Sequence, residues 1–308
     1  MKSICIIGSI NMDLFTIVDK MPVLGETVFG SHYFLSPGGK GANQAVATAR
    51  LGESTILIGK VGQDSYGNQL IQVLKDNGVE TKYIQQEADI LTGFANIYVD
   101  QNGSNQITVI PGANSALRPQ DIDQAISAIE SSKVVVCQLE IPTETAIYGL
   151  KKAKVAGAVT ILNPSPTRDF DDAILQYTDI LIPNEIELVQ IMKIDNEPTI
   201  QQVFDFMAQH RLKILITTLG ENGCMAYSNS LTVHYPAKDV VATNTTAAGD
   251  AFIGGFVKSY SNHYDLGNAI DMAQEVAAYT VTQNGSMTSL PYSKDLEIAS
   301  RKILKGWF

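Results

Sequence analysis

The sequence predicts an α/β protein with a doubly wound, mostly parallel sheet and a small second sheet that projects from it. One observation is the alternation of short apolar runs with segments of helical periodicity, which is typical of repeated βαβ units. The other is a pair of β-rich excursions inside this alternation, which indicates a sheet outside the main one. The expected buried strands are residues 4–7, 55–58, 134–137, 159–162, 180–182 and 214–217. The expected helices include residues 67–77, 143–156, 200–210 and 266–277.

Length and composition are those of one large soluble domain, residues 1–308, with 45% hydrophobic and 18% charged residues. The net charge of −10 argues against a nucleic-acid partner, because binding to phosphate backbones needs a basic surface. We expect no membrane span, since no apolar run reaches roughly 18 residues, and the first run is too short for a signal peptide. The cysteines, Cys5, Cys137 and Cys224, lie apart in apolar runs, so we expect reduced core residues in a cytoplasmic protein.

The first predicted strand, residues 4–7, is followed closely by Asn11 and Asp13. In open α/β sheets ligands bind at the carboxyl ends of the strands, so this amide and carboxylate are candidate partners for sugar hydroxyl groups. An Asx-type turn leaving the strand explains the same two residues equally well.

Each β-rich excursion contains two short predicted strands. In the first, residues 14–18 and 27–29 are separated by a segment containing Pro22 and Gly25. In the second, residues 94–99 lead through the polar turn at 100–103 to residues 107–110.

Between the excursions, the glycine-rich turn SPGGKG at residues 36–41 feeds a helix that ends before Gly52. The turn is not a Walker A loop, because no Ser or Thr follows the lysine. It is not a dinucleotide fingerprint either, because Gln44 stands at the third glycine position. Such turns are common in α/β proteins, but Lys40 and Asn43 can both face a ligand, which favours a binding function.

Three further polar sites follow predicted strands. Glu140 follows the strand at residues 134–139 and faces the same rim as Asn11. Asn184 and Glu187 have the spacing of a helix cap, which the local sequence favours, although the same oxygens can hold the waters of a Mg²⁺ ion. The glycine turn that begins at Thr218 can approach a nucleotide or simply lead into the hairpin of residues 224–227 and 231–235.

The segment NTTAAGD, residues 244–250, leads into a helix that we expect to begin near Ala251. Its small residues allow a ligand to approach the backbone, and the N–H groups of a helix start favour an anion. Asp250 is then an acid among groups arranged for phosphate. A carboxylate that only complements the helix dipole is an equally good local explanation.

Together these motifs resemble the ribokinase branch of the PfkB carbohydrate kinases over essentially the whole chain. In chain order the matching segments are GSINMD at 8–13, PVLGET at 22–27, GGKGANQ at 38–44, Glu140, NEIE at 184–187, TLG at 218–220 and TAAGD at 246–250. The resemblance implies a ribokinase-like fold with a β lid formed by about residues 12–36 and 92–111. It also implies a homodimer made through the lids.

The resemblance further implies a role for each matched residue. The sugar is bound by Asn11, Asp13, Gly39, Lys40, Asn43 and Glu140. Asp250 is the general base, and the backbone of Ala247, Ala248, Gly249 and Asp250 is the anion hole. Asn184 and Glu187 organise Mg²⁺ through water, and Asn184, Thr218, Gly220 and Gly249 contact ATP. A monovalent cation, K⁺, lies beside the anion hole on Asn244, Thr246, Gly285 and Ser289.

The chain departs from the family pattern at two positions. The family usually has Asp as a K⁺ ligand where this chain has Asn244, so we expect weaker cation binding. Gln274 stands where a near relative would carry His close to the adenine.

The activity that this resemblance favours is ATP-dependent phosphorylation of D-ribose at O5, giving ribose 5-phosphate. The alternatives are a kinase for deoxyribose, a ketose or a nucleoside, and a sugar-binding protein whose catalysis has decayed. Because Asp250, Lys40 and Glu140 are all present, decay is the weaker alternative. The missing dinucleotide fingerprint makes an oxidoreductase weaker still.

Overall fold

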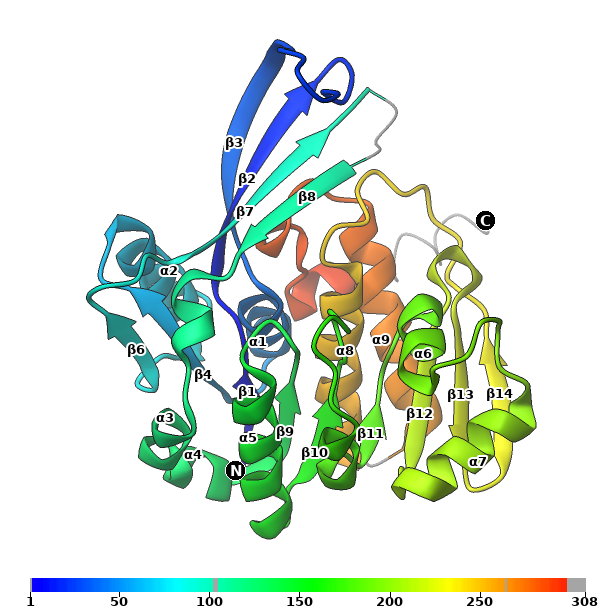
Figure 1. The fold of residues 1–308 in the computed structure, drawn as a ribbon. Coiled ribbons are helices and arrows are strands. Elements are labelled where there is room, and N and C mark those ends of the chain that lie inside the picture. Colours follow the sequence, from blue (N-terminus) through cyan, green and yellow to red (C-terminus); the bar gives the residue numbers. More distant parts are fainter. Residues whose placement is uncertain (1, 102–104, 264, 298–308) are drawn as a thin grey trace.

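The computed structural model describes residues 2–101, 105–263 and 265–297, and it has helices on both faces of a central sheet (Figure 1). Within these residues the central sheet has ten strands in the order β14-β13-β12-β11-β10-β9-β1-β4-β5, with β6 paired to β4. Every pair is parallel except β12–β13 and β13–β14. The strands are β1 Ser3–Ile7, β4 Thr55–Gly62, β5 Val79–Glu80, β6 Ile84–Glu87, β9 Ser132–Cys137, β10 Val159–Leu162, β11 Ile180–Leu181, β12 Ile214–Thr218, β13 Cys224–Ser228 and β14 Leu231–Tyr235.

The two faces of the central sheet belong to two separate hydrophobic cores, because successive side chains of a strand point to opposite faces. In β1, Ile4 and Ile6 pack into one core, whereas Cys5 and Ile7 pack into the other. The first core is closed by α1 Lys40–Arg50, α2 Ser65–Asp76, α8 Ala248–His263 and α9 Leu266–Val281. The second is closed by α3 Pro119–Gln124, α4 Ile126–Glu130, α5 Thr143–Val155, α6 Glu185–Met192 and α7 Ile200–His210. The predicted doubly wound fold is therefore confirmed.

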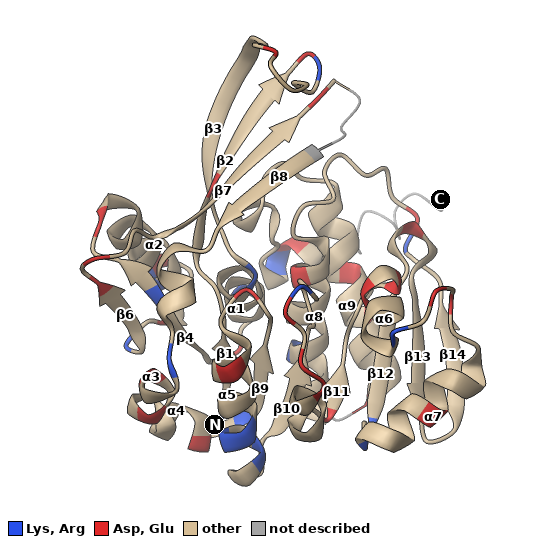
Figure 2. Cartoon of the chain, viewed as in Figure 1, with Lys and Arg blue, Asp and Glu red and all other residues tan. Residues whose placement is uncertain are grey.

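A second sheet stands away from this body at the carboxyl ends of the central strands (Figure 1). Its strands are β2 Asn11–Val18, β3 Gly30–Gly38, β7 Gly93–Val99 and β8 Asn105–Ile110, in the order β3-β2-β7-β8. Asp13 is the one Asp, Glu, Lys or Arg in these four strand sequences. Figure 2 shows that most of this sheet carries neither acidic nor basic residues. The predicted small projecting sheet is thus present. Short 3₁₀ turns at Gly112–Ala116, Asp172–Tyr177, Gly220–Asn222 and Met287–Ser289 complete the described elements.

The structure corrects several predicted boundaries. Residues 27–29 are not a strand, because the pairing with β2 begins only where Val18 meets Gly30. The strand before Glu140 ends at Cys137, so Glu140 lies in the following loop. The helix expected near Ala251 is longer and begins at Ala248. The predicted turn at residues 100–103 falls partly outside the described residues, at 102 and 103.

The cysteines Cys5, Cys137 and Cys224 are buried free thiols, as predicted. Among the described residues, the helices are all too short or too polar to cross a bilayer.

Candidate active site

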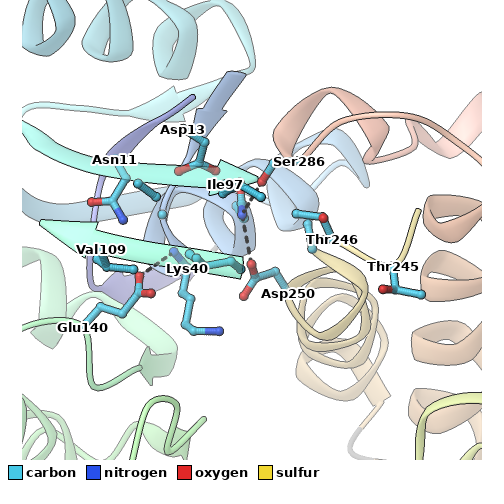
Figure 3. Close-up of a pocket in the computed structure, with 15 residues that line it drawn as sticks. Asn11, Asp13, Lys40, Ile97, Val109, Glu140, Thr245, Thr246, Asp250 and Ser286 are labelled. Carbon is cyan, nitrogen blue, oxygen red and sulfur yellow. Dashed lines mark hydrogen bonds between the residues drawn. The ribbon is translucent and has the colours of Figure 1, made fainter. Parts of the chain in front are cut away.

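A cavity of about 300 Å³ lies between the small sheet and the carboxyl ends of the central strands (Figure 3). Its lining is Asn11, Asp13, Gly39, Lys40, Asn43, Ala95, Ile97, Ile107, Val109, Glu140, Thr245, Thr246, Ala247, Asp250 and Ser286. All six residues predicted to bind sugar are among them, together with the predicted base. Residues separated by more than 200 positions in the sequence therefore meet at one site.

The amide of Asn11 and the carboxylate of Asp13 enter the cavity from the start of β2, just past the end of β1. Asn114 donates a hydrogen bond to Asn11 Oδ1 (2.7 Å) and accepts one from the Ile10 N–H (2.9 Å), which fixes the Asn11 side chain. Gly38 on β3 lies so close to Asp13 that an added Cβ would stand 1.9 Å from Asp13 Oδ2. Glycine at this position therefore makes room for the carboxylate.

Asp13 is only 6% exposed, and its environment disfavours ionisation. Burial raises the pKa of its carboxyl to about 7, and repulsion from Glu140 and Asp250 adds to the shift. The Ser286 hydroxyl and the Lys40 ammonium act in the opposite direction and lower this pKa. A buried carboxyl with a perturbed pKa is typical of a functional site, where hydrogen-bond donors from a ligand can offset the cost of burying the charge.

Lys40 and Glu140 both line the cavity. Gly39 has a φ of 89°, a left-handed conformation that suits glycine, and starts α1 so that the Lys40 N–H reaches Glu140 Oε2 (3.2 Å). The Ser9 hydroxyl donates to the same oxygen (2.5 Å). Burial lowers the pKa of Lys40, but attraction to Asp250 and Glu140 offsets this, and the net pKa is raised. Lys40 is thus a cation that interacts electrostatically with the carboxylates around the cavity.

Asp250 lies in the first turn of α8 and is 6% exposed. The side-chain amide of Asn43 donates to its Oδ2 (3.0 Å), and that of Gln44 donates to its Oδ1 (2.9 Å). Burial raises the pKa of Asp250, whereas Lys40 and the two amide donors lower it, and the net pKa is raised. A buried carboxyl with a raised pKa, held in one orientation, is suited to accept a proton.

The turn before Asp250 presents backbone N–H groups. Ala247 has a φ of 62°, unusual for alanine, and its carbonyl accepts the first α-helical hydrogen bond, from Ala251 (2.8 Å). The N–H groups of Gly249 and Asp250 precede that bond, where a helix start lacks intrahelical acceptors. A Cβ added to Gly249 would meet no atom within 4 Å, so the surface above it is open. This geometry is suitable for binding an anion.

The residues predicted to contact Mg²⁺ and ATP lie outside the lining of this cavity. Asn184 and Glu187 form a reciprocal cap of α6, in which each side chain accepts the other residue's backbone N–H (2.8 and 2.9 Å). The favoured capping interpretation is therefore confirmed. Thr218 pairs with Asn184 in an isolated β-bridge, and Gly220 follows it with a φ of 56°. These residues share one edge of the central sheet.

The residues predicted to bind K⁺ lie at the end of α9 and near it. The N–H groups of Thr243 and Asn244 donate to the Val281 carbonyl (2.7 and 3.1 Å). Asn244 Oδ1 accepts the Thr246 N–H (2.8 Å), so one side-chain oxygen is already used within the turn. In the segment after α9, Gly285 has a φ of 105° and the buried Ser289 hydroxyl donates to the Ser286 carbonyl (2.6 Å).

Several residues to which the sequence motifs gave no role lie at the site in the structure. Gln44 contacts Asp250, Asn114 and Ser9 hold Asn11 and Glu140, and Ser286 accepts from Asn43 (3.1 Å). Gln44 stood at the end of the GGKGANQ motif, one residue beyond Asn43. Ser286 and the apolar wall Ala95, Ile97, Ile107 and Val109 carried no sequence signal, because their contacts depend on tertiary packing. Gln274, the second departure from the family pattern, donates to the Tyr235 carbonyl (2.9 Å).

The fold and site can be compared with known proteins. A family model for the pfkB family of carbohydrate kinases matches residues 1–292. This chain belongs to that family. The PfkB kinase is 34% identical to a mouse (Mus musculus) ribokinase over 304 residues, covering 96% of this chain and 94% of the relative. It is 36% identical to a Salmonella typhi deoxyribokinase over 291 residues, covering 94% and 95% of the two chains.

Solved structures agree with this assignment. The structure of Arabidopsis thaliana ribokinase complexed with ribose and ATP matches the PfkB kinase with a TM-score of 0.88 and 27% identity. The match covers 96% of this chain and 98% of that one. The PfkB kinase is therefore a carbohydrate kinase of the ribokinase type by sequence and by fold.

Proposed function

We propose that this PfkB kinase transfers the γ-phosphoryl group of ATP to O5 of D-ribose. The observation that carries the proposal is the position of Asp250, a buried carboxylate at the start of α8 that faces the cavity lined by Asn11, Asp13, Lys40, Asn43 and Glu140. Such a cavity offers several fixed donors and acceptors to a small polyol. The similarity to mouse and Arabidopsis ribokinases supports ribose as the substrate.

In the proposed reaction Asp250 accepts the proton of the sugar O5 hydroxyl as O5 attacks the γ-phosphorus. The bond from phosphorus to the β–γ bridging oxygen breaks, and ADP leaves with that electron pair. Phosphoryl transfer needs positioning and charge stabilisation more than covalent chemistry from the protein. The N–H groups at the start of α8 stabilise the charge on the transferred group, and Ala247 through Gly249 let it approach closely.

The residues of the chain fit the cofactors of such a reaction. Glu187 uses Oε2 for the helix cap, which leaves Oε1 for a water of Mg²⁺, and Mg²⁺ is usually held by few protein oxygens in nucleotide sites. Bound Mg²⁺ would neutralise charge on the phosphates of ATP, whose nucleotide would lie along Thr218, Gly220 and Gly249. The single side-chain oxygen of Asn244 already accepts the Thr246 N–H and lacks the charge of an aspartate, so only its second lone pair is left for K⁺. The proposed K⁺ site, with Thr246, Gly285 and Ser289, is therefore weak.

Deoxyribose is the second candidate substrate, because a deoxyribokinase is as similar to this chain as the ribokinases are. A panel of ribose, 2-deoxyribose, fructose and adenosine, assayed by coupled ADP release, separates the candidates by kcat/KM. Sites that hydrogen-bond a hydroxyl reject analogues that lack it by large factors. We expect ribose to give the highest kcat/KM. The ribose assignment is wrong if ribose is not among the best substrates, and the kinase assignment is wrong if no sugar is phosphorylated.

We also propose that the small sheet is a β lid over the sugar and that two copies of the chain dimerise through their lids. The lid exposes apolar side chains, including Phe29, Tyr33, Leu35 and Ile110, which are 41 to 88% exposed. Charged residues are rare in its strands (Figure 2), so pairing of two such surfaces would bury apolar area at little desolvation cost. Sedimentation equilibrium should give a dimer for the wild type and a monomer for Tyr33→Glu. A wild-type monomer contradicts the proposal.

A further inference from the structure

A set of buried amides connects Asp250 to the centre of the molecule. Gln44, on α1, is fully buried, and its Nε2 donates both to Asp250 Oδ1 (2.9 Å) and to Asn163 Oδ1 (3.3 Å). Its Oε1 accepts from Nε2 of Gln138, which follows β9 and is also fully buried (2.5 Å). Each end of the Gln44 amide therefore has a partner of the opposite polarity.

The direction of these hydrogen bonds is set by a backbone group. The Ile182 carbonyl can only accept, so it fixes the Asn163 amide with Nδ2 toward the carbonyl (3.0 Å) and Oδ1 toward Gln44. Gln44 must then turn its Nε2 toward Asn163 and Asp250, and its Oε1 toward Gln138. The reversed Gln44 amide would place Oε1 against the carboxylate and leave Gln138 Nε2 facing a second donor.

The fold leaves space for the Gln138 side chain beside Gln44. An added Cβ on Gly8, at the end of β1, would stand 2.0 Å from Gln138 Oε1, so glycine at position 8 leaves the space that this amide occupies. Gln138 Oε1 itself has no hydrogen-bond partner among the described residues. Leaving a buried amide oxygen unpaired costs stability, which argues that the Nε2 contact to Gln44 is the reason for this amide.

We propose that Gln44 is a positioning residue for the general base, that it orients and stabilises the Asp250 carboxylate, and that Gln138 acts through Gln44 by fixing its amide. This inference rests on the proposed role of Asp250 as the base. Asn43 holds Oδ2 of the carboxylate and Gln44 holds Oδ1, so the plane of the carboxylate is fixed by two donors at opposite oxygens. The remaining lone pairs of the Asp250 carboxylate then keep one orientation relative to the cavity.

The charge of Asp250 depends on these donors because other groups around it have opposing effects. Lys40, on α1, favours the carboxylate, whereas Glu140, after β9, and Asp13, on β2, repel it. Burial raises the pKa of Asp250, and the Gln44 hydrogen bond lowers it. Removing a hydrogen bond to a charged group should raise this pKa by about one to two pH units.

The test compares wild type with Gln44→Leu, Gln138→Leu and the double variant. Thr48→Val is the matched control, because Thr48 is a fully buried polar residue one turn further along α1. Its hydroxyl donates to the Gln44 backbone carbonyl (2.7 Å) and makes no other hydrogen bond within the described part of the chain. Two quantities are measured. The first is the pKa of the Asp250 carboxyl in the free enzyme, by ¹³C NMR, with Asp250→Asn assigning the signal. The second is the pH profile of kcat, which reports groups in the substrate complex.

In Gln44→Leu we expect the Asp250 signal and the acid limb of kcat to move up by about one to two pH units, and the plateau kcat to fall about tenfold. The KM for sugar should stay within about threefold, because Gln44 does not line the cavity. Gln138→Leu should move the Asp250 titration and the acid limb of kcat in the same direction, but by less than Gln44→Leu does. The double variant should match Gln44→Leu alone, since Gln138 acts through it.

Unchanged Asp250 titration in Gln44→Leu, or a shift as large in Thr48→Val, overturns the proposal. Additive shifts in the double variant overturn the role of Gln138. If Gln44→Leu does not fold, Gln138→Leu decides the question by the same readouts, and no shift in it counts against the proposal. The NMR titration needs no substrate, so it still tests the amide network if the wild type phosphorylates no sugar and the proposed function itself fails.

Discussion

Replacing Asp13 with Asn should stabilise the folded protein although it removes a residue that we place in the sugar site. Asp13 is 6% exposed, has carboxylate neighbours and makes no ion pair among the described residues. A neutral amide of the same size avoids the cost of burying a charge there. It can still accept the hydrogen bond of Ser286 through its oxygen.

The magnitude follows from the pKa of Asp13. The folded value of about 7 lies above the ordinary value of 3.8 that applies in the unfolded chain. Below about pH 4 the carboxyl is protonated in both states and costs nothing. Between the two pKa values the unfolded chain releases its proton first, so folding loses about 1.4 kcal/mol per pH unit. Above pH 7 the loss is constant, at about 4 kcal/mol.

The assay is urea-induced unfolding of wild type and Asp13→Asn without ligand, from pH 5 to pH 8. The variant should be more stable, and its advantage in free energy of unfolding should grow by about 2–3 kcal/mol over this range. Asp121→Asn is the control, because Asp121 is equally buried but pairs with Lys60 (2.9 Å), so its loss should destabilise. An Asp13→Asn variant that is no more stable than wild type at pH 8, or whose stability advantage does not depend on pH, would contradict the raised pKa of Asp13.

Three more outcomes follow from the site. Asn244→Asp should be activated by K⁺ at lower concentration than wild type, and equal K⁺ dependence in activity assays would show that the charge at position 244 has no effect. Gly38→Ala should raise the sugar KM about tenfold or more by displacing Asp13, whereas Gly30→Ala, at the far end of β3, should leave it nearly unchanged. Sugar affinity measured by calorimetry should fall as the pH drops below about 7, because Asp13 then binds a proton, and affinity that stays constant to pH 5 would contradict this.

Much of the fold was predictable because local signals agreed with the tertiary structure. Strand β10, Val159–Leu162, and helix α7, Ile200–His210, have the predicted bounds, since apolar runs and helical spacing are local properties. The first residue of β3 was not predictable, because it depends on where the partner strand β2 ends, at Val18. The start of α8 also differed, since the left-handed Ala247 that precedes it has no signature in an alanine.

The residues of the site also fall into those that local motifs predict and those that only tertiary contacts reveal. Lys40, Asn43 and Asp250 could be proposed from motifs in which glycine turns precede helices, and the structure places them around one cavity. Ser286 could not, because its contact with Asn43 joins residues 243 positions apart. Gln44 stood in a recognised motif without a role, since only the folded chain brings it to Asp250.

We propose above that Asp250 is the general base of a sugar kinase. The most direct measurement is ribose-dependent ADP release by wild type and Asp250→Asn, with ribose binding measured calorimetrically in both. We expect kcat to fall by several orders of magnitude in the variant while ribose still binds, because only the proton acceptor is lost. Substantial turnover by Asp250→Asn would contradict it.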